Sequence, residues 1–424
     1  MQDVVITGMG IVSPVGIGRA DVWSAITAGR SGIHTIPLQV AGNMPIPFGG
    51  EVPDFKPKQY VRPRKSLKVM SRETQLGFTA ASLAWSDAGL DDFSIDPERL
   101  GVICAANMFS CDLEDVTRAF GQCTDRSDAA GPGKFDFSLW GITGLGQMYP
   151  LWFLKYLPNM TACHVSIAFD ARGPVNTMVQ GDTSALLAII EAVDVIARGD
   201  ADLVLAGGTS STVTILDQTW HAGARLSTRK DAPEAASRPF DADRDGAVAS
   251  EGASLFVLES RAHALARKKR ILATILGHGR RFESCADSKR PTGLAVRLAI
   301  EAALVSGKVH PQKVGHVNAH GLSTREDDAI EAQAIQKVLG DVPVTAPKSY
   351  LGNSGAGSGA TELAISLLGL EQNLVPPTLN YERSDPACPV NVSAQPQPAR
   401  SPIVLALNHK LTGQAVALLV RAES

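Results

Sequence analysis

Short runs of β-branched and aliphatic residues recur along the chain and alternate with stretches that have a helical period. The extended runs cover residues 4–9, 99–104, 201–208, 253–259, 315–321 and 402–408. Residues 75–89, 184–199 and 328–340 instead place apolar side chains three and four positions apart. Because that spacing gathers apolar side chains on one helix face, whereas the short runs suit buried strands, the pattern predicts an α/β protein.

The clearest local unit lies between residues 178 and 208. The pattern predicts a helix from Thr183 to Arg198, with Gly199 at its C-cap and the strand ADLVLAGG directly after it. The turn before this helix reads Gly-Asp-Thr-Ser, which places Asp182 at the helix start. Aspartate is favoured there because its carboxylate can accept backbone N–H bonds, so helix capping is the simplest expectation for Asp182.

Two segments resemble peripheral insertions. Residues 105–160 are rich in Phe, Trp, Tyr and Gly, and residues 208–240 mix Ser and Thr with charged residues. Since connections are typically about 4–6 residues long, segments of this length generally carry function or bind a partner. For the aromatic stretch 148–160, a buried wall or subunit interface is favoured over direct ligand contact.

Length and composition narrow the classes of function. A chain of 424 residues exceeds what one core commonly serves, so two core-forming halves or a duplicated unit are expected. The net charge of -3 favours neither nucleic acid nor membrane as a partner, and no run of about 18 apolar residues predicts a membrane span. The N-terminus reads as a buried strand and the six cysteines lack CxxC or metal-type spacing. We therefore expect a cytoplasmic protein with reduced thiols, no metal and no cofactor.

Two local motifs have competing interpretations. The run DADRDGAVASEG (241–252) resembles a calcium loop, but Gly252 stands where that loop needs glutamate, so we interpret its acids as turn and capping residues. Basic residues gather at 62–72 and 267–270. Each basic cluster is either a solvated face or a docking patch for an acidic partner.

Six segments in order along the chain together resemble the β-ketoacyl-acyl carrier protein synthases of the elongating type. They are VVITGMGIVSPVG, GPVNTMVQGDTSA, GDADLVLAGG, RPFDADRDGAVASEGA, VNAHGLST and KSYLGNSGAGSGATE. The resemblance implies a thiolase-like fold, with five αβαβα layers built from two βαβαβαββ halves, here residues 1–255 and 256–424. It also implies a dimer and an acyl carrier protein as partner. In that light, the first basic cluster becomes a carrier-docking patch, comprising Arg62, Arg64, Lys65, Lys68 and Arg72.

The nucleophile of this family is a cysteine at the start of a buried helix. The helix N-terminus lowers the thiol pKa, and backbone N–H groups form an oxyanion hole. A match without gaps, anchored on Gly173-Pro174 and on residues 199–202, places Asp182 at the cysteine position. Acyl transfer to a carboxylate would give a mixed anhydride in place of a thioester, so we expect no acyl-enzyme.

The other active-site positions of the family are partly kept. His320 matches the first family histidine, although Leu322 stands where the family has threonine, and Lys348 matches the supporting lysine. Asn353 replaces the second histidine. This replacement is not inactivating by itself, because the initiating ketosynthases and chalcone synthase use His and Asn to hold the thioester oxygen.

The gating loop of the family, GFGGTN, corresponds here to HKLTGQA (409–415). Leu411 takes the place of the phenylalanine that admits the substrate, and Gly413 is kept. Since glycine alone freely visits positive φ, the loss of the other glycines predicts a stiffer loop.

Three functions stay open from the sequence. The first is a non-condensing homologue similar to chain length factor subunits, as a homodimer or paired with a cysteine-bearing ketosynthase; those subunits typically carry glutamine at the nucleophile position. The second is an enzyme that decarboxylates or hydrolyses acyl thioesters with His320, Asn353 and Asp182. The third is a scaffold that only binds an acyl carrier or a lipid. Four retained positions argue against an inert pocket: His320, Lys348, Glu362 and Glu251.

Overall fold

One mixed sheet of 12 strands runs through the described part of the chain, in the order β15-β13-β12-β17-β18-β11-β1-β10-β9-β5-β8, with β2 paired to β1. The computed structural model describes residues 3–91, 93, 95–108, 111–125, 133–221, 226–285 and 290–423, without the side chains of residues 220 and 221. The first five long strands are β1 (Val4–Ser13), β5 (Leu100–Ala105), β8 (Val175–Met178), β9 (Leu203–Ser211) and β10 (Glu251–Ser260). The others are β11 (Ala273–Phe282), β12 (His316–Asn318), β13 (Pro343–Thr345), β15 (Asn391–Val392), β17 (Ile403–His409) and β18 (Gln414–Ala422), with β2 at Gly16–Ile17.

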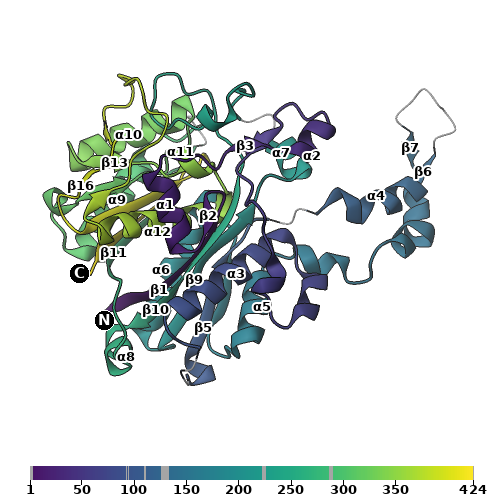
Figure 1. Cartoon of the computed structure of the whole chain (residues 1–424), viewed down its shortest axis with the longest axis horizontal. Coiled ribbons are helices and arrows are strands. Elements are labelled where there is room, and N and C mark those ends of the chain that lie inside the picture. The colour runs from purple at the N-terminus through teal and green to yellow at the C-terminus, as the bar shows by residue number, and fades with distance from the viewer. Residues whose placement is uncertain are drawn as a thin grey trace.

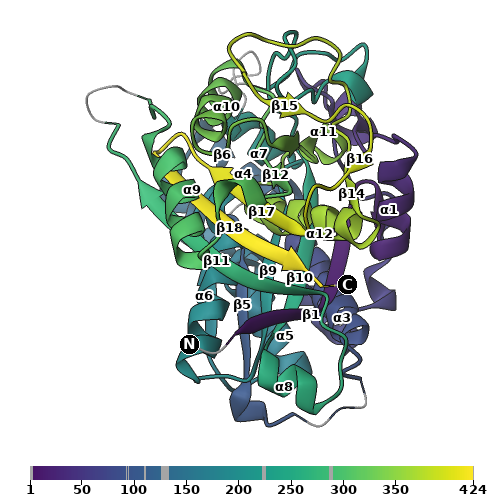
Figure 2. The ribbon, with the colours of Figure 1, turned by 90° about the vertical axis from the view of Figure 1, so that its left-hand side faces the viewer.

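The strand order of the first half repeats in the second. In the first half, β1, β10 and β9 pair antiparallel, and β9, β5 and β8 pair parallel. In the second half, β11, β18 and β17 pair antiparallel, and β17, β12 and β13 pair parallel. Figure 2 shows β11 and β18 side by side, with α9 (Leu294–Gly307) packed on them. The α/β class and the duplicated βαβαβαββ topology are therefore confirmed.

The predicted division after residue 255 falls inside β10. Because β10 belongs wholly to the first topological unit, we propose that the halves divide in the connection formed by α8 (Arg261–Ala266) and the residues before β11.

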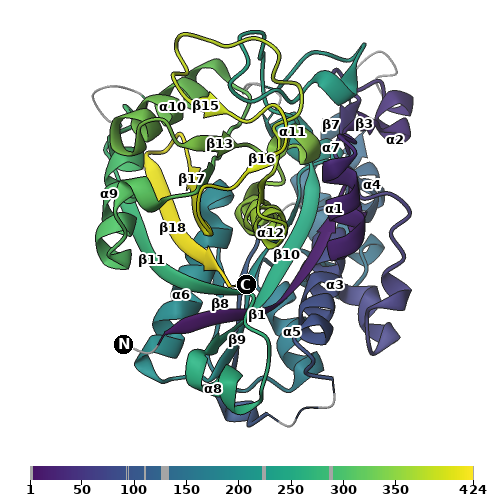
Figure 3. The ribbon, with the colours of Figure 1, turned by 60° about the vertical axis from the view of Figure 1, so that its left-hand side comes forward.

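Helices cover both faces of each half-sheet. On one outer face, α3 (Arg72–Asp87) packs on β1, β9 and β10, and α5 (Met160–Phe169) packs on β5. On the opposite outer face, α9 and α10 (Arg325–Leu339) cover the second half. Between the half-sheets lie α6 (Ser184–Arg198) and α12 (Ser358–Glu371), whose apolar residues join one buried cluster with strands of both halves. Figure 3 shows α12 nearly end-on between β10 and the pair β17–β18, so the molecule has five layers.

Local sequence explains the central elements. Helix α6 begins and ends within one residue of the predicted bounds, and Gly199 at its C-cap adopts φ 83°. Strand β1 lies so close to α3 that a Cβ on Gly10 would sit 2.0 Å from the carbonyl oxygen of Ala80. A glycine is required there because any side chain would enter the helix backbone.

The calcium-like run forms a turn, as interpreted. The Asp241 carboxylate accepts hydrogen bonds from the backbone N–H groups of Asp243, Glu382 and Arg383. It also accepts a side-chain hydrogen bond from Arg238 Nε at 2.9 Å. These donors lower the pKa of Asp241 although burial opposes them.

The first predicted insertion projects from the body as an arm (Figure 1), which we define as residues 111–125 and 133–156. It contains α4 (Leu113–Gln122) and the strand pair β6 (Thr124–Asp125) and β7 (Lys134–Phe135), followed by short turns of helix. The shorter helices of the body are α1 (Arg19–Thr27), α2 (Pro37–Ala41), α7 (Ile215–His221) and α11 (Lys348–Leu351). No described helix has both the length and the apolar character needed to cross a membrane.

Candidate active site

The structure brings Asp182, His320, Asn353 and Leu411 into the wall of one cavity of about 630 Å³. Asp182 lies in the turn between β8 and α6, and His320 follows β12. Asn353 follows α11, and Leu411 lies in the turn between β17 and β18. Asp182 therefore comes from a connection in the first half of the sheet and His320 from one in the second half, and both side chains meet at the cavity wall.

Asp182 does not cap α6 with its carboxylate, which corrects the expectation from the sequence. Among the described residues, the hydrogen bond to the Asp182 carboxylate comes from Asn353 Nδ2, at 3.0 Å from Oδ1. The helix start is held by other groups: Gln180 N donates to Ser184 Oγ, and the Thr183 hydroxyl donates to the Gln180 carbonyl. The carboxylate is therefore directed to the cavity rather than to the helix backbone.

The Asn353 side chain is fixed at both ends. Its Oδ1 accepts from the Ser358 hydroxyl at 2.9 Å and from Gly355 N at 3.3 Å, which turns Nδ2 toward Asp182. The Asn353 amide nitrogen has two N–H donors, so one can donate to Asp182 while the other donates to a ligand. Asp182 and Asn353 thus form a hydrogen-bonded pair in the cavity wall.

Lys348 organises a buried network behind His320. Its Nζ contacts Glu362 Oε1, donates to the His320 carbonyl at 2.9 Å and lies 3.1 Å from His320 Nδ1. Lys348, Glu362 and His320 are 1%, 2% and 1% exposed. Burial raises the pKa of Glu362, while Lys348 opposes that rise.

The protonation of His320 follows from its neighbours. Burial first, then the charges of Lys348 and His409, hold the pKa of His320 well below its ordinary value of 6.5. Its Nδ1 faces two donors, Lys348 Nζ and Asn408 Nδ2, the latter at 3.2 Å. The imidazole is therefore neutral with its proton on Nε2, a state suited to donate to a carbonyl oxygen.

Three residues that support His320 gave no signal in the sequence. Asn408 Nδ2 also donates to Glu362 Oε2 at 3.1 Å. Glu331 on α10 accepts the backbone N–H groups of His320 and Gly321, at 2.6 and 2.8 Å. The His409 ring lies 4.8 Å from that of His320, and Glu331 raises the pKa of His409 although burial opposes it.

The loop at 409–415 is a tight turn between β17 and β18, closed by hydrogen bonds from Lys410 N to the Gln414 carbonyl and from Gly413 N to the Lys410 carbonyl. Leu411 lines the cavity as predicted and is 38% exposed. Gly413 instead packs against the backbone of Glu283, where a Cβ would lie 2.1 Å from the carbonyl oxygen. Its role is therefore in the turn, with φ 94°, rather than in contact with a substrate.

Lys410 is a further cavity residue that the sequence did not indicate. A Cβ on Gly181, which has φ 59°, would lie 2.9 Å from Lys410 Nζ. The lysine side chain thus lies over the backbone that precedes Asp182, and it brings a positive charge to the wall that holds this carboxylate.

A cysteine does line the cavity, which the alignment had not revealed. Cys111 lies in the wall, but burial and the charges of Asp112 and other nearby acids raise its pKa, whereas the bond from its own backbone opposes this. Since the thiolate is the nucleophilic form of cysteine, a raised pKa makes Cys111 a weak nucleophile.

The cavity shares wall residues with two other spaces. Cys111 and Leu216 also line a pocket of about 630 Å³ within the arm, whose wall is mainly apolar. Its aromatic lining consists of Phe120, Trp140 and Trp152. The arm pocket thus lies directly beside the main cavity, and its mainly apolar wall is of the kind that suits a hydrocarbon chain.

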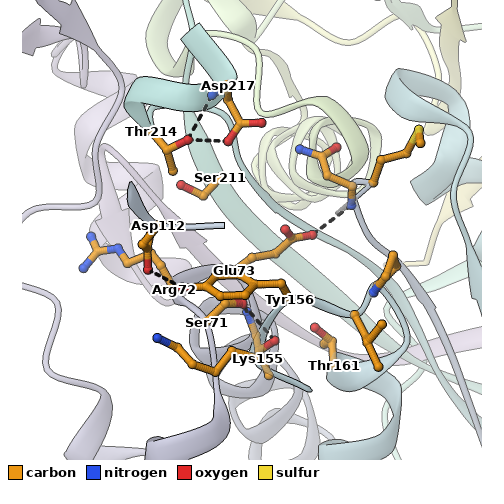
Figure 4. Close-up of a pocket in the computed structure, with 15 residues that line it drawn as sticks. Ser71, Arg72, Glu73, Asp112, Lys155, Tyr156, Thr161, Ser211, Thr214 and Asp217 are labelled. Carbon is orange, nitrogen blue, oxygen red and sulfur yellow. Dashed lines mark hydrogen bonds between the residues drawn. The ribbon is translucent and has the colours of Figure 1, made fainter. Parts of the chain in front are cut away.

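The second space, shown in Figure 4, is small and polar, with a volume of about 40 Å³. Glu73 accepts from Asn107 N at 2.8 Å, and burial raises the pKa of Glu73 to about 8, with Asp217 contributing in the same direction. Tyr156 donates to Asp112 at 3.0 Å. Asn107 and Asp217 also line the main cavity, so the two spaces share a wall.

The predicted docking patch is split by the structure. Arg62, Arg64, Lys65 and Lys68 are exposed around a short 3-10 helix, Arg64–Val69. Arg72 instead forms a salt bridge to the 1%-exposed Glu251, at 2.6 Å, and donates to the Val52 carbonyl. The Arg72 guanidinium is therefore engaged within the fold, whereas the other four side chains are exposed to solvent, and docking by Arg72 stays a prediction. Glu251, retained from the family pattern, serves this structural bond.

Two family models match the chain: Beta-ketoacyl synthase, N-terminal domain, over residues 1–264, and Beta-ketoacyl synthase, C-terminal domain, over residues 272–382. The 3-oxoacyl-[acyl-carrier-protein] synthase 2 of Coxiella burnetii is 34% identical over 391 residues, 91% of this chain and 90% of its own length. The tetracenomycin polyketide synthase ketoacyl synthase alpha subunit of Streptomyces glaucescens is 34% identical over 392 residues, 91% of this chain and 88% of its own length.

Three solved structures are similar over the whole of both chains. A beta-ketoacyl synthase from Burkholderia phymatum STM815 has a TM-score of 0.88 at 30% identity. The ishigamide ketosynthase/chain length factor has a TM-score of 0.85 at 27% identity. AntDE:AntF, a type II PKS acyl-carrier protein in complex with its ketosynthase bound to the hexaketide, has a TM-score of 0.81 at 27% identity.

Proposed function

The chain belongs to the β-ketoacyl synthase family, and we propose that it is a non-condensing member that works with an acyl carrier protein beside a cysteine-bearing ketosynthase. One observation carries this proposal: the nucleophile position holds Asp182, bonded to Asn353 within the cavity. In this role the chain resembles a chain length factor, which shapes the space for a growing chain without forming the acyl-enzyme.

The chemistry of condensation argues for this assignment. Condensation needs a thiolate that accepts the acyl group and later releases it to a carbon nucleophile. The Asp182 carboxylate is a weak nucleophile toward a thioester, and its product would be a mixed anhydride. Cys111 is held as a thiol by its surroundings. Among the described residues that line the cavity, none is therefore suited to carry the acyl intermediate.

The intact network around His320 favours a second candidate function, decarboxylation or hydrolysis of an acyl thioester. A neutral His320 with a proton on Nε2, together with the free N–H of Asn353, could hold a thioester oxygen as charge develops on it. Asp182 could act as a general base on water. In the third candidate, a scaffold for an acyl carrier or lipid, the network would only stabilise the cavity.

Exposed apolar surface supports a protein partner. In the arm, Phe137 and Ile142 are 81% and 78% exposed, and Phe153 is 49% exposed. Strand β8 pairs with β5 on one side and ends the sheet order on the other, with Val175 half exposed. Apolar patches and sheet edges of this kind are generally covered by another chain. The name of the ishigamide structure gives a ketosynthase and a chain length factor together.

For the carrier protein, we propose the exposed basic patch defined by Arg62, Arg64, Lys65 and Lys68 as the docking surface. The four side chains are close in sequence and unburied, so their positive charge is available to an acidic partner. AntDE:AntF is by its name a complex of a carrier protein with a ketosynthase.

The partner role is tested by expressing the chain alone and together with a cysteine-bearing homologue encoded nearby. We expect a defined heterodimer by native mass spectrometry, and product chain lengths that change when Phe120 or Trp140 of the arm pocket is replaced by alanine. A stable homodimer that does not exchange with the homologue would reject the proposal.

The second candidate is tested with malonyl-carrier protein and the chain purified alone. Carbon dioxide release that His320→Ala abolishes, and that exposed His310→Ala leaves unchanged, would establish the altered enzyme. No turnover in either variant or in the native chain would support a non-catalytic partner.

A further inference from the structure

A buried pair of glutamines ends at the cavity wall. Gln39 on α2 and Gln218 on α7 are 1% and 2% exposed, and Gln218 lines the main cavity. Gln39 Nε2 donates to the Val213 carbonyl at 2.6 Å, and Gln218 Nε2 donates to Gln39 Oε1 at 3.2 Å. The two amides form a chain of hydrogen bonds that runs from a backbone carbonyl to the cavity.

The orientation of Gln218 is fixed by this chain. Because Gln39 presents its nitrogen to Val213, it must present its oxygen to Gln218, and an opposite orientation of Gln218 would bring two oxygens together. Gln218 Oε1 is left buried and has no hydrogen-bond partner among the described residues. An unmatched buried acceptor destabilises the protein, so a donor brought by a ligand would relieve that cost.

The surrounding wall selects for donors as well. Asp217 lines the same cavity next to Gln218, and its carboxylate already accepts from the Thr214 hydroxyl. A carboxylate and an amide oxygen both accept hydrogen bonds. A keto oxygen or a carboxylate of a ligand would therefore meet only acceptors from these two side chains.

Building on the proposed function, we propose that the cavity takes acyl chains that carry a hydrogen-bond donor, a hydroxyl or an amine, which donates to Gln218 Oε1. The same site discriminates against a chain with a keto group at that carbon. A plain hydrocarbon chain would leave the acceptor unmatched and would bind with intermediate affinity. The apolar walls beyond Cys111 would hold the rest of the chain.

Binding of non-hydrolysable probes tests this proposal. We would titrate the full chain with an acyl-pantetheine amide, its series of monohydroxy and monoamino analogues, and the matching keto analogues, by isothermal titration calorimetry. One position in the hydroxy or amino series should bind roughly tenfold more tightly than the plain chain, with the keto analogue weakest. The series that binds more tightly, hydroxy or amino, shows which of the two donors the site prefers.

Variants assign the effect to the amide. Gln218→Met, close in length and without an acceptor, should reduce the preference for the donor to less than about twofold while plain-chain binding stays the same or improves. If this variant does not fold, Gln218→Asn retracts the amide by one methylene and should give the same loss. Thr219→Val, an exposed position on the same helix, is the control that should keep the preference.

The outcomes separate this inference from the function on which it rests. If no acyl probe binds to the native chain, the proposed acyl-binding function fails. If all probes bind with equal affinity, or if Gln218→Met keeps the preference, the acyl site stands and the assignment of a donor-selective position is wrong.

Discussion

Replacing Lys348 by methionine measures how much the buried ion pair of Lys348 and Glu362 contributes to the free energy of unfolding. Methionine has a similar length, so packing changes little, but Glu362 loses its cationic partner while it is 2% exposed. Breaking a buried ion pair in this way generally costs about 3–5 kcal/mol. The remaining bond from Asn408 does not neutralise the carboxylate.

Protonation of Glu362 limits this cost. At pH 7 the Glu362 carboxyl can become neutral at a cost of about 1.4 kcal/mol for each pH unit above its ordinary pKa of 4.5, or about 3 kcal/mol in all. We therefore expect Lys348→Met to lower the free energy of unfolding by about 3 kcal/mol at pH 7. Since the folded variant then binds a proton that the unfolded chain releases, the loss should fall to about 1 kcal/mol or less at pH 5.

Urea unfolding at several pH values, followed by circular dichroism, measures both quantities. Glu362→Gln added to Lys348→Met should recover most of the loss at pH 7 and remove its pH dependence. Lys337→Met, at an exposed site on α10, should change stability by less than about 0.5 kcal/mol. A loss below about 1 kcal/mol in Lys348→Met, or one that does not vary with pH, would refute this account of the network.

Three other results are expected. Asp182→Cys, supplied with malonyl- and acyl-carrier protein, should give no condensation product by mass spectrometry, because Asn353 and the loop at Leu411 also differ from the family pattern. A condensation product from this variant would show that Asn353 and this loop do not limit the reaction. Burial raises the pKa of Glu73 to about 8, so the folded chain holds a proton that the unfolded chain releases, and stability should fall as pH rises from 4.5 to 8. Glu73→Gln should flatten that slope in urea unfolding, and an unchanged slope would contradict it. Arg64→Glu and Lys68→Glu should each weaken carrier binding roughly two- to fivefold in a salt-sensitive manner, whereas Arg72→Glu should lower the melting temperature; equal effects on binding and stability for all three would contradict the division of this cluster.

Local patterns predicted the helices and strands well because these elements depend on interactions between residues close in sequence. The period of residues 184–199 and the capping glycine at 199 set the bounds of α6 within one residue. Ordered motifs also identified Asp182, His320, Asn353 and Lys348 as candidates for one site. Three of the four line the cavity, and Lys348 contacts His320 from behind.

The sequence could not reveal partners that are distant in the chain. Helix capping was the best local expectation for Asp182, but Asn353 lies 171 residues away and competes successfully for the carboxylate. The same limit applies to Arg72. Its neighbours in sequence place it in a basic cluster, but its side chain binds Glu251, 179 residues later. No short motif marks Cys111 or Gln218 as a wall residue, because the cavity forms only when the arm and α7 fold onto the body.

Strand β1 has a consequence for how the molecule can be divided. It pairs with β10 along most of its length, and its residues Val5 and Ile6 also pair with the first residues of β11. A fragment that starts at β11 would leave that strand with a bare edge, and apolar residues of α12 would lose the neighbours that they share with the first half. The two halves repeat one topology but share a sheet and a buried core, so domain exchange with a relative should carry β1 together with both of its neighbours.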